Sequence, residues 1–313
     1  MLREALFRLS QEPHLHDFAT HNPLAWQFAS RFVAGVTLDH ALAVVRSLNG
    51  QGMTATLDHL GENVSSRDAA REAARTYASD LRAIAGAGLE SNISIKLTQL
   101  GLDLDEEFTY ENALTVVSQA AELKTFVRID MEGSAYVQRT LDTFYRLFER
   151  HPNVGIVIQS YLYRSKDDLE RLLRVGARVR LVKGAYLENS AVAYQDKAEV
   201  DRNYVALMKM LLDSGTYPAI ATHDPAMIAA TRDYARQNAK GSESFEFQML
   251  YGIRRDLQTQ LVHDGYRMRI YVPYGTEWYP YLMRRLAERP ANVMFVTRGL
   301  VQEALQGIRL GRR

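Results

Sequence analysis

The chain has 313 residues, of which 38 are basic, 37 are acidic, 47% are hydrophobic and none is cysteine. Without cysteine, disulfides, thiolate catalysis, cysteine zinc sites and protein-ligated iron–sulfur clusters are excluded, so redox chemistry needs an organic cofactor or a metal with nitrogen and oxygen ligands. A net charge of +1 provides no long-range field for a polyanion, and we expect no nucleic-acid partner.

Residues 1–51 predict an N-terminal helical arm, with helices at Asp17–Gly35 and Thr37–Leu48 and with Thr37 as an N-cap. Met1–Ser10 lacks the continuous apolar core of a signal peptide, and no segment reaches the roughly 18 apolar residues of a membrane span. We therefore expect an intracellular, cytoplasmic protein, and docking onto a membrane surface stays open. His14 and His16 lack the accompanying carboxylate pattern of a metal site, and we expect no metal.

Residues 52–313 alternate short β-branched segments with amphipathic segments. The predicted strands are Met53–Asp58, Ile93–Thr98, Phe126–Met131, Val154–Gln159, Val179–Lys183, Ala219–Thr222, Phe245–Leu250 and Met268–Val272. The predicted helices are Arg67–Ala85, Tyr110–Leu123, Ala135–Arg150, Asp167–Val175, Asp201–Ser214, Pro225–Asn238, Arg254–Asp264 and Glu277–Arg289. This order predicts parallel βαβ units, and eight of them favour a closed (β/α)8 barrel in a single domain over the alternative, an open doubly wound sheet.

Polar residues lie at or near the C-terminal ends of six of the predicted strands. They are Asp58, Lys96, Asp130, Gln159, Lys183 and His223. We expect an apolar barrel interior, so polar residues that gather at the C-terminal strand ends indicate an active site there. Lys96 is costly to bury between Ile95 and Leu97 without an anion, and the expected partner is Asp130 or a substrate carboxylate.

The last predicted helix presents Tyr281, Arg284, Arg285 and Glu288 on one face, at spacings of i, i+3, i+4 and i+7. Two guanidinium groups can fork around a carboxylate or a phosphate, although tandem arginines on a helix are more often a solvated face. The residues alone thus indicate a barrel that binds, or acts on, a small anionic molecule.

Nine segments, one per strand or nearly so, carry a family pattern in order. They are Leu57–Glu62, Ile93–Gly101, Val127–Met131, Gly155–Tyr161, Arg180–Tyr186, Ala221–Asp224, Phe245–Gly252, Arg269–Gly275 and Tyr281–Arg285. With them the chain resembles the proline dehydrogenase family in its single-function bacterial form. Two departures from the longer, bifunctional relatives are Leu187, where many have Trp, and Asp224, where they have Asn.

The resemblance implies a distorted (β/α)8 barrel with its last helix over the barrel mouth and with FAD bound noncovalently at the C-terminal strand ends. It implies oxidation of L-proline to Δ1-pyrroline-5-carboxylate by hydride transfer to flavin N5, the first step of proline catabolism to glutamate. The implied electron acceptor is a membrane quinone, and hence peripheral contact with the inner face of the plasma membrane. The alternatives are a flavin barrel reductase of the folate type and a non-catalytic amino-acid-binding barrel.

The resemblance also implies a role for individual residues. Arg284 and Arg285, assisted by Lys96, would take the proline carboxylate, and Asp130 would orient an arginine or the lysine. The residues around the proline ring would be Ala185, Tyr186, Leu250, Tyr271 and Tyr281. Contacts to the flavin would come from Asp130, Gln159, Arg180, Val182, Lys183, Gly184, Ala185, Lys197, Thr222 and His223. Glu62 would act as a gate by pairing with Arg285.

Overall fold

The computed structural model describes residues 23–214 and 216–288 of the chain. Two sequence-based expectations lie partly or wholly outside these residues. His14 and His16 fall outside them, and so does the first part of the predicted helix Asp17–Gly35.

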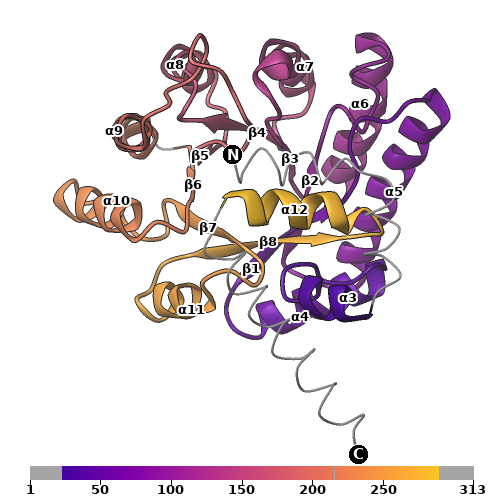
Figure 1. Cartoon of the computed structure of the whole chain (residues 1–313), viewed down its shortest axis with the longest axis horizontal. Helices are drawn as coiled ribbons and strands as arrows, with labels where there is room; N and C mark the ends of the chain where they lie inside the picture. The colour runs from indigo at the N-terminus through magenta and orange to yellow at the C-terminus, as the bar shows by residue number, and fades with distance from the viewer. Residues whose placement is uncertain (1–22, 215, 289–313) are drawn as a thin grey trace, which may run out of the picture.

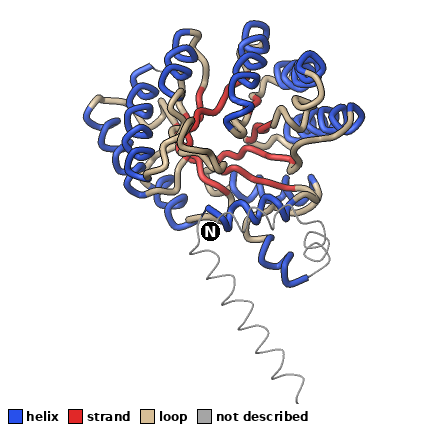
Figure 2. Tube along the Cα trace, turned by 45° about the horizontal axis from the view of Figure 1, so that its top comes forward, coloured by secondary structure: helices blue, strands red, loops and turns tan. Residues whose placement is uncertain are grey.

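Eight parallel strands form a closed barrel in chain order, and β8 pairs with β1 to complete it. The strands are β1 (Thr54–His59), β2 (Ser91–Ile95), β3 (Val127–Ile129), β4 (Val154–Gln159), β5 (Val179–Val182), β6 (Ala219–Ala221), β7 (Glu246–Leu250) and β8 (Met268–Tyr274). Figure 2 shows these strands at the centre, with the helices around them. The predicted barrel is therefore confirmed over the open sheet, and the predicted strands differ from the observed ones by a few residues at their ends.

Ten α-helices are present in the described part of the chain. They are α3 (Pro23–Ala29), α4 (Leu38–Asn49), α5 (Arg67–Gly86), α6 (Glu106–Glu122), α7 (Val137–Arg150), α8 (Ser165–Arg174), α9 (Lys197–Ser214), α10 (Pro225–Gln237), α11 (Arg255–His263) and α12 (Trp278–Glu288). The start of the predicted helix Ala135–Arg150 is instead a 3-10 turn, η1 (Ser134–Tyr136). Polar caps fix several of the remaining starts; Thr37, for example, accepts from the main-chain N–H of His40 as expected.

The barrel interior is polar, and our expectation of an apolar filling is wrong. Along each strand successive side chains point to opposite faces. Ile93 and Ile95 of β2 belong to the apolar core shared with the surrounding helices. The residue between them, Ser94, donates from its Oγ at 2.9 Å to Oδ1 of Asp130, which directly follows β3. The apolar core therefore lies between the strands and the helices, and the alternate residues leave a hydrophilic interior.

The last helix, α12, lies across the barrel, as Figure 1 shows. It packs on α3 through Trp26 and Trp278, whose ring centroids are 5.5 Å apart in an edge-on arrangement. Tyr281 and Leu282 are buried in the same small apolar cluster with Val33. Part of the N-terminal arm thus holds α12 at the end of the barrel formed by the C-terminal strand ends, which we call the mouth; the opposite end is the base.

Candidate active site

A buried ion pair lies in the mouth. Lys96 follows β2, and its Nζ lies 2.8 Å from Asp58 Oδ1 and 3.8 Å from Asp130 Oδ2. The first partner is therefore Asp58, which we counted among the polar strand ends but did not expect as the partner of Lys96, and Asp130 is the second. The reason is local, because β1 and β2 are neighbours in a register that sets Asp58 opposite Ser94. Burial opposes the charge on Lys96, but the two carboxylates raise its pKa well above the usual value.

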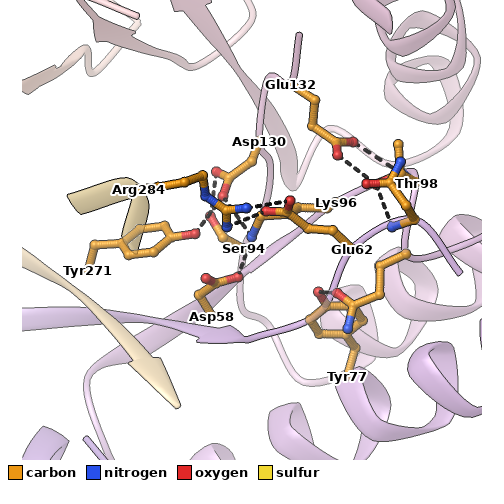
Figure 3. A network of polar contacts seen from close by, with 12 residues as sticks. Asp58, Glu62, Tyr77, Ser94, Lys96, Thr98, Asp130, Glu132, Tyr271 and Arg284 are labelled. Carbon is orange, nitrogen blue, oxygen red and sulfur yellow. Dashed lines mark hydrogen bonds and ion pairs between the residues drawn. The ribbon is translucent and has the colours of Figure 1, made fainter. Parts of the chain in front are cut away.

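Asp130 is the centre of a network that crosses the barrel (Figure 3). Its Oδ1 accepts from Arg180 Nη1 at 2.7 Å and from Ser94 Oγ at 2.9 Å, and its Oδ2 accepts from the Tyr271 hydroxyl at 2.6 Å. These partners come from β5, β2 and β8. Arg180 also lies over the Tyr271 ring, 5.3 Å from its centroid. Two carboxylates therefore fix one lysine and one arginine on the inner surface of the mouth.

An ion pair joins α12 to the loop after β1. Arg284 donates from both Nη atoms to the two Glu62 carboxylate oxygens, at 2.8 and 2.7 Å. We expected Arg285 to make this pair, and the structure corrects that expectation. Successive helical residues point about 100° apart, so adjacent arginines cannot both face Glu62 in the same way. Arg285 instead lies beside Tyr281, with its Cζ 5.3 Å from the ring centroid.

Glu132 is a further carboxyl group of the mouth that sequence reasoning missed. It accepts from the Thr98 hydroxyl at 2.6 Å and from the Thr98 main-chain N–H at 3.2 Å. Gln159 Nε2 donates to its main-chain carbonyl at 2.9 Å. Burial raises the pKa of Glu132 to about 7. Alternation was the signal that could have found it, because Glu132 is two residues after Asp130.

The loop after β5 holds several of the expected ligand contacts. Val182 ends that strand, and Gly184, Ala185 and Tyr186 follow it. Gly184 has a φ of +121°, and a Cβ there would lie 2.3 Å from the ring of Tyr161, so the backbone passes this ring only because the residue is glycine. Burial, together with Glu62 and Glu132, raises the pKa of Tyr186. Tyr186 therefore lies near the ion pair that joins α12 to the barrel.

A second group of charges lies at the ends of β5 and β6. Lys183 Nζ donates to Asp201 and, at 2.7 Å, to Asp224 Oδ2. Lys197 Nζ also donates to Asp201, and it lies 3.5 Å from Asp224. Sequence reasoning had assigned both lysines to the flavin but had missed Asp201.

His223 is fixed in one tautomer beside this group. Its Nε2 accepts from the main-chain N–H of Leu250 at 2.9 Å. The proton of the neutral ring is therefore on Nδ1. Thr222 accepts from the main-chain N–H of Asp224 at 3.1 Å and so shapes the turn into α10. Thr222, His223 and Leu250 thus sit where the C-terminal ends of β6 and β7 meet.

A family model described as proline dehydrogenase matches residues 41–298. Proline dehydrogenase 1 of Bacillus subtilis is 42% identical over 303 residues, which cover 97% of this chain and 100% of that protein. Proline dehydrogenase of Deinococcus radiodurans is 40% identical, over 96% of this chain and 98% of that protein. The bifunctional protein PutA of Escherichia coli is 32% identical in a match covering 86% of this chain and 24% of PutA.

Solved structures of longer proteins share the barrel. Proline utilization A from Bdellovibrio bacteriovorus, inactivated by N-propargylglycine, superposes with a TM-score of 0.79 at 30% identity, covering 84% of this chain and 32% of that chain. Proline utilization A from Bradyrhizobium japonicum gives a TM-score of 0.73 at 25% identity, covering 87% and 32%. This chain therefore spans about a third of the length of these solved chains.

Proposed function

The chain belongs to the proline dehydrogenase family and is an oxidoreductase of proline catabolism, and from this premise we propose a specific reaction and site. The enzyme oxidises L-proline to Δ1-pyrroline-5-carboxylate with noncovalently bound FAD and passes the electrons to a membrane quinone. The observation that carries this proposal is the buried network of Lys96, Asp130 and Arg180 in the mouth, because it fixes two cations beside each other beneath α12.

The residues of the mouth fit a flavin dinucleotide. Arg180 is buried, and its Nε has no hydrogen-bond partner among the described residues. Further donors lie at the ends of β4 to β6 and at the start of α9. They are Gln159, Lys183, Lys197, Thr222 and His223. Such a donor set suits a ligand rich in carbonyl, hydroxyl and phosphate oxygens. Bound FAD would accept a hydride at its N5 atom. We propose that Arg180 and Asp130 hold the isoalloxazine end, with the loop from Val182 to Ala185.

Substrate binding follows from the cations beneath and on α12. Lys96 remains charged because Asp58 and Asp130 offset its burial. We propose that Lys96, Arg284 and Arg285 hold the proline carboxylate. The pair of Arg284 and Glu62 has partly exposed side chains, so Arg284 can turn some of its N–H groups to a substrate carboxylate at modest cost while it stays paired with Glu62.

Aliphatic and aromatic side chains complete the proposed substrate site. We propose that Ala185, Tyr186, Leu250, Tyr271 and Tyr281 enclose the proline ring. Each misfit methylene in such an enclosure costs about 1–3 kcal/mol, which favours a five-membered ring. The ring would lose a hydride from C5, the carbon beside nitrogen that does not bear the carboxylate, and the resulting iminium would lose its N–H proton to water on release, giving the cyclic imine. Glu62 with Arg284 forms the gate that excludes water during this step.

Contact with a membrane would be peripheral. Within residues 23–214 and 216–288, no helix has both the length and the apolar character needed to cross a bilayer. We propose a bacterial protein of the cytoplasm that meets its quinone at the inner face of the plasma membrane.

The test is spectroscopic. The purified full chain should be yellow, and L-proline should bleach the flavin absorbance without any added nicotinamide; a short-chain quinone should restore the colour. A folate-type reductase would instead be bleached by a reduced nicotinamide, and an amino-acid-binding barrel would not be bleached at all. A protein that stays colourless after incubation with FAD would contradict the proposal.

A further inference from the structure

The lysines expected to hold the flavin phosphates are already paired with carboxylates. Lys183 donates to both Asp201 and Asp224, and Lys197 donates to Asp201 and approaches Asp224. Two ammonium groups and two carboxylates make a cluster with no net charge. A diphosphate that approaches these lysines therefore finds their positive charges already offset by the two carboxylates.

Asp224 is the more replaceable of the two carboxylates. Asp201 accepts hydrogen bonds from both Lys183 and Lys197, so this one carboxylate can hold the two lysines in place. Asp224 has a second role as the N-cap of α10, where its Oδ1 accepts from the main-chain N–H of Ala226 at 3.0 Å. Asparagine caps helices about as well as aspartate. An Asp224→Asn substitution therefore removes one charge and leaves the cap and the lysine positions supported.

Both carboxylates are charged at neutral pH. Although partial burial acts in the opposite direction, hydrogen bonds from Lys183 and from the main chain lower the pKa of Asp224 to about 2. The hydrogen bonds from Lys183 and Lys197 likewise outweigh burial and lower the pKa of Asp201. The side chains of Lys183 and Asp224 are about a quarter exposed, at 24% and 23%, so a ligand can reach them.

We infer that Asp224 sets the affinity of the site for the flavin diphosphate by competing with it for the ammonium group of Lys183. The inference rests on the proposed FAD site and deepens it. In the cofactor-free protein the carboxylate neutralises Lys183; when a diphosphate binds, its oxygens replace Asp224 as acceptors. Asp224 is thus a positioning residue whose charge weakens cofactor binding.

Flavin affinity gives a direct test. The full chain, freed of flavin by dialysis, is titrated with FAD and with riboflavin, which has no phosphate, and the quenching of flavin fluorescence is followed. Asp224→Asn should bind FAD about tenfold more tightly at low ionic strength, because one negative charge is removed beside a dianion. The gain should shrink in 0.5 M salt. Riboflavin affinity should not change.

A matched control comes from the same helix. Asp233 lies on an exposed face of α10, where it accepts from Arg236 at 2.6 Å, and Asp233→Asn removes the same charge away from the lysines. It should leave both flavin affinities unchanged. A thermal melt of each variant checks that the protein as a whole remains folded.

The possible failures are distinguishable. If wild-type protein binds neither flavin, the proposed FAD site itself is wrong. If wild-type protein binds FAD but Asp224→Asn binds it equally or less tightly, the competition inference alone is wrong, and Asp224 instead orients Lys183. Equal tightening for riboflavin and FAD would also overturn the inference, because the effect would not act through the phosphates.

Discussion

At the mouth of the barrel, Lys96 and Arg180 are held by the side chains of Asp58 and Asp130, whereas at the base Arg128 is held by the main chain. Arg128 Nη1 donates to the carbonyl of Ile156 at 3.0 Å and to that of Arg178 at 2.5 Å. Main-chain carbonyls of a closed sheet cannot move aside, but carboxylate side chains can. The mouth therefore allows its cations to exchange partners with a ligand, and the base does not.

The two ends also differ in their balance of charge. At the base, Glu246 lies among the arginines; it accepts from Arg269 Nε at 2.9 Å, and it influences the buried Arg128. Burial opposes the charge on Glu246, but Arg269 outweighs it and lowers the pKa of the carboxyl. At the mouth, two carboxylates, those of Asp58 and Asp130, pair with two cations, Lys96 and Arg180. Glu246 thus acts on Arg128, Arg178 and Arg269 at once, which indicates a structural role for this end.

The largest effect should come from Glu246→Gln. Glu246 is 2% exposed, and its loss leaves Arg269 and Arg128 without their counter-charge in a buried site. We expect the free energy of unfolding to fall by about 4 kcal/mol, as for other broken buried pairs. Urea unfolding at neutral pH measures it, with the exposed Glu243→Gln as the matched control near zero. A change below about 1 kcal/mol would show that the base tolerates unpaired arginines.

The mouth should respond to a similar change mainly through catalysis. Asp130→Asn removes the charge that orients Arg180, and Asp58 still pairs with Lys96. We expect kcat for proline oxidation to fall about 100-fold, or about 3 kcal/mol in activation free energy, while the free energy of unfolding falls by about 1–2 kcal/mol. Steady-state kinetics and urea unfolding of the same variant measure both. If the free energy of unfolding falls as far as in Glu246→Gln while kcat is unchanged, the mouth would have the same structural role as the base, contrary to our expectation.

The sequence predicted the barrel and the location of the mouth because both depend on local pattern. β-branched segments such as Val154–Gln159 form strands with the predicted bounds, and the polar residue that ends a strand lies at the mouth by topology alone. Contacts between side chains of different strands, by contrast, do not follow from local pattern. Which of Asp58 and Asp130 approaches Lys96 more closely depends on strand register, which the sequence does not encode in any single segment.

Two other features were beyond a reading of strand ends. The choice of Arg284 over Arg285 as the partner of Glu62 depends on the rotation of α12, which packing against α3 fixes. Polar and apolar residues alternate along the strands, as Arg128, Ile129 and Asp130 do, and this pattern indicates a polar interior. The general expectation that barrels are filled with apolar side chains led to the wrong prediction. Alternation within strands should therefore be considered before the composition of the strand.

The smallest of the expected effects concerns pH and again separates the two ends. Burial raises the pKa of Glu132 at the mouth from 4.5 to about 7, so the folded protein holds a proton there that the unfolded chain releases. The stability from this group is present at low pH and is lost as pH rises through 7. Relative to wild type, Glu132→Gln should therefore gain about 1–2 kcal/mol of unfolding free energy between pH 6 and pH 8.5.

At the base, Glu246 has a lowered pKa and stays ionised across this range, so the loss of unfolding free energy in Glu246→Gln should be the same at both pH values. Urea unfolding of the three proteins at both pH values measures the difference, and a Glu132→Gln curve parallel to wild type would mean that the Glu132 carboxyl is ionised in the mouth at both pH values, held there by the neighbouring Lys96.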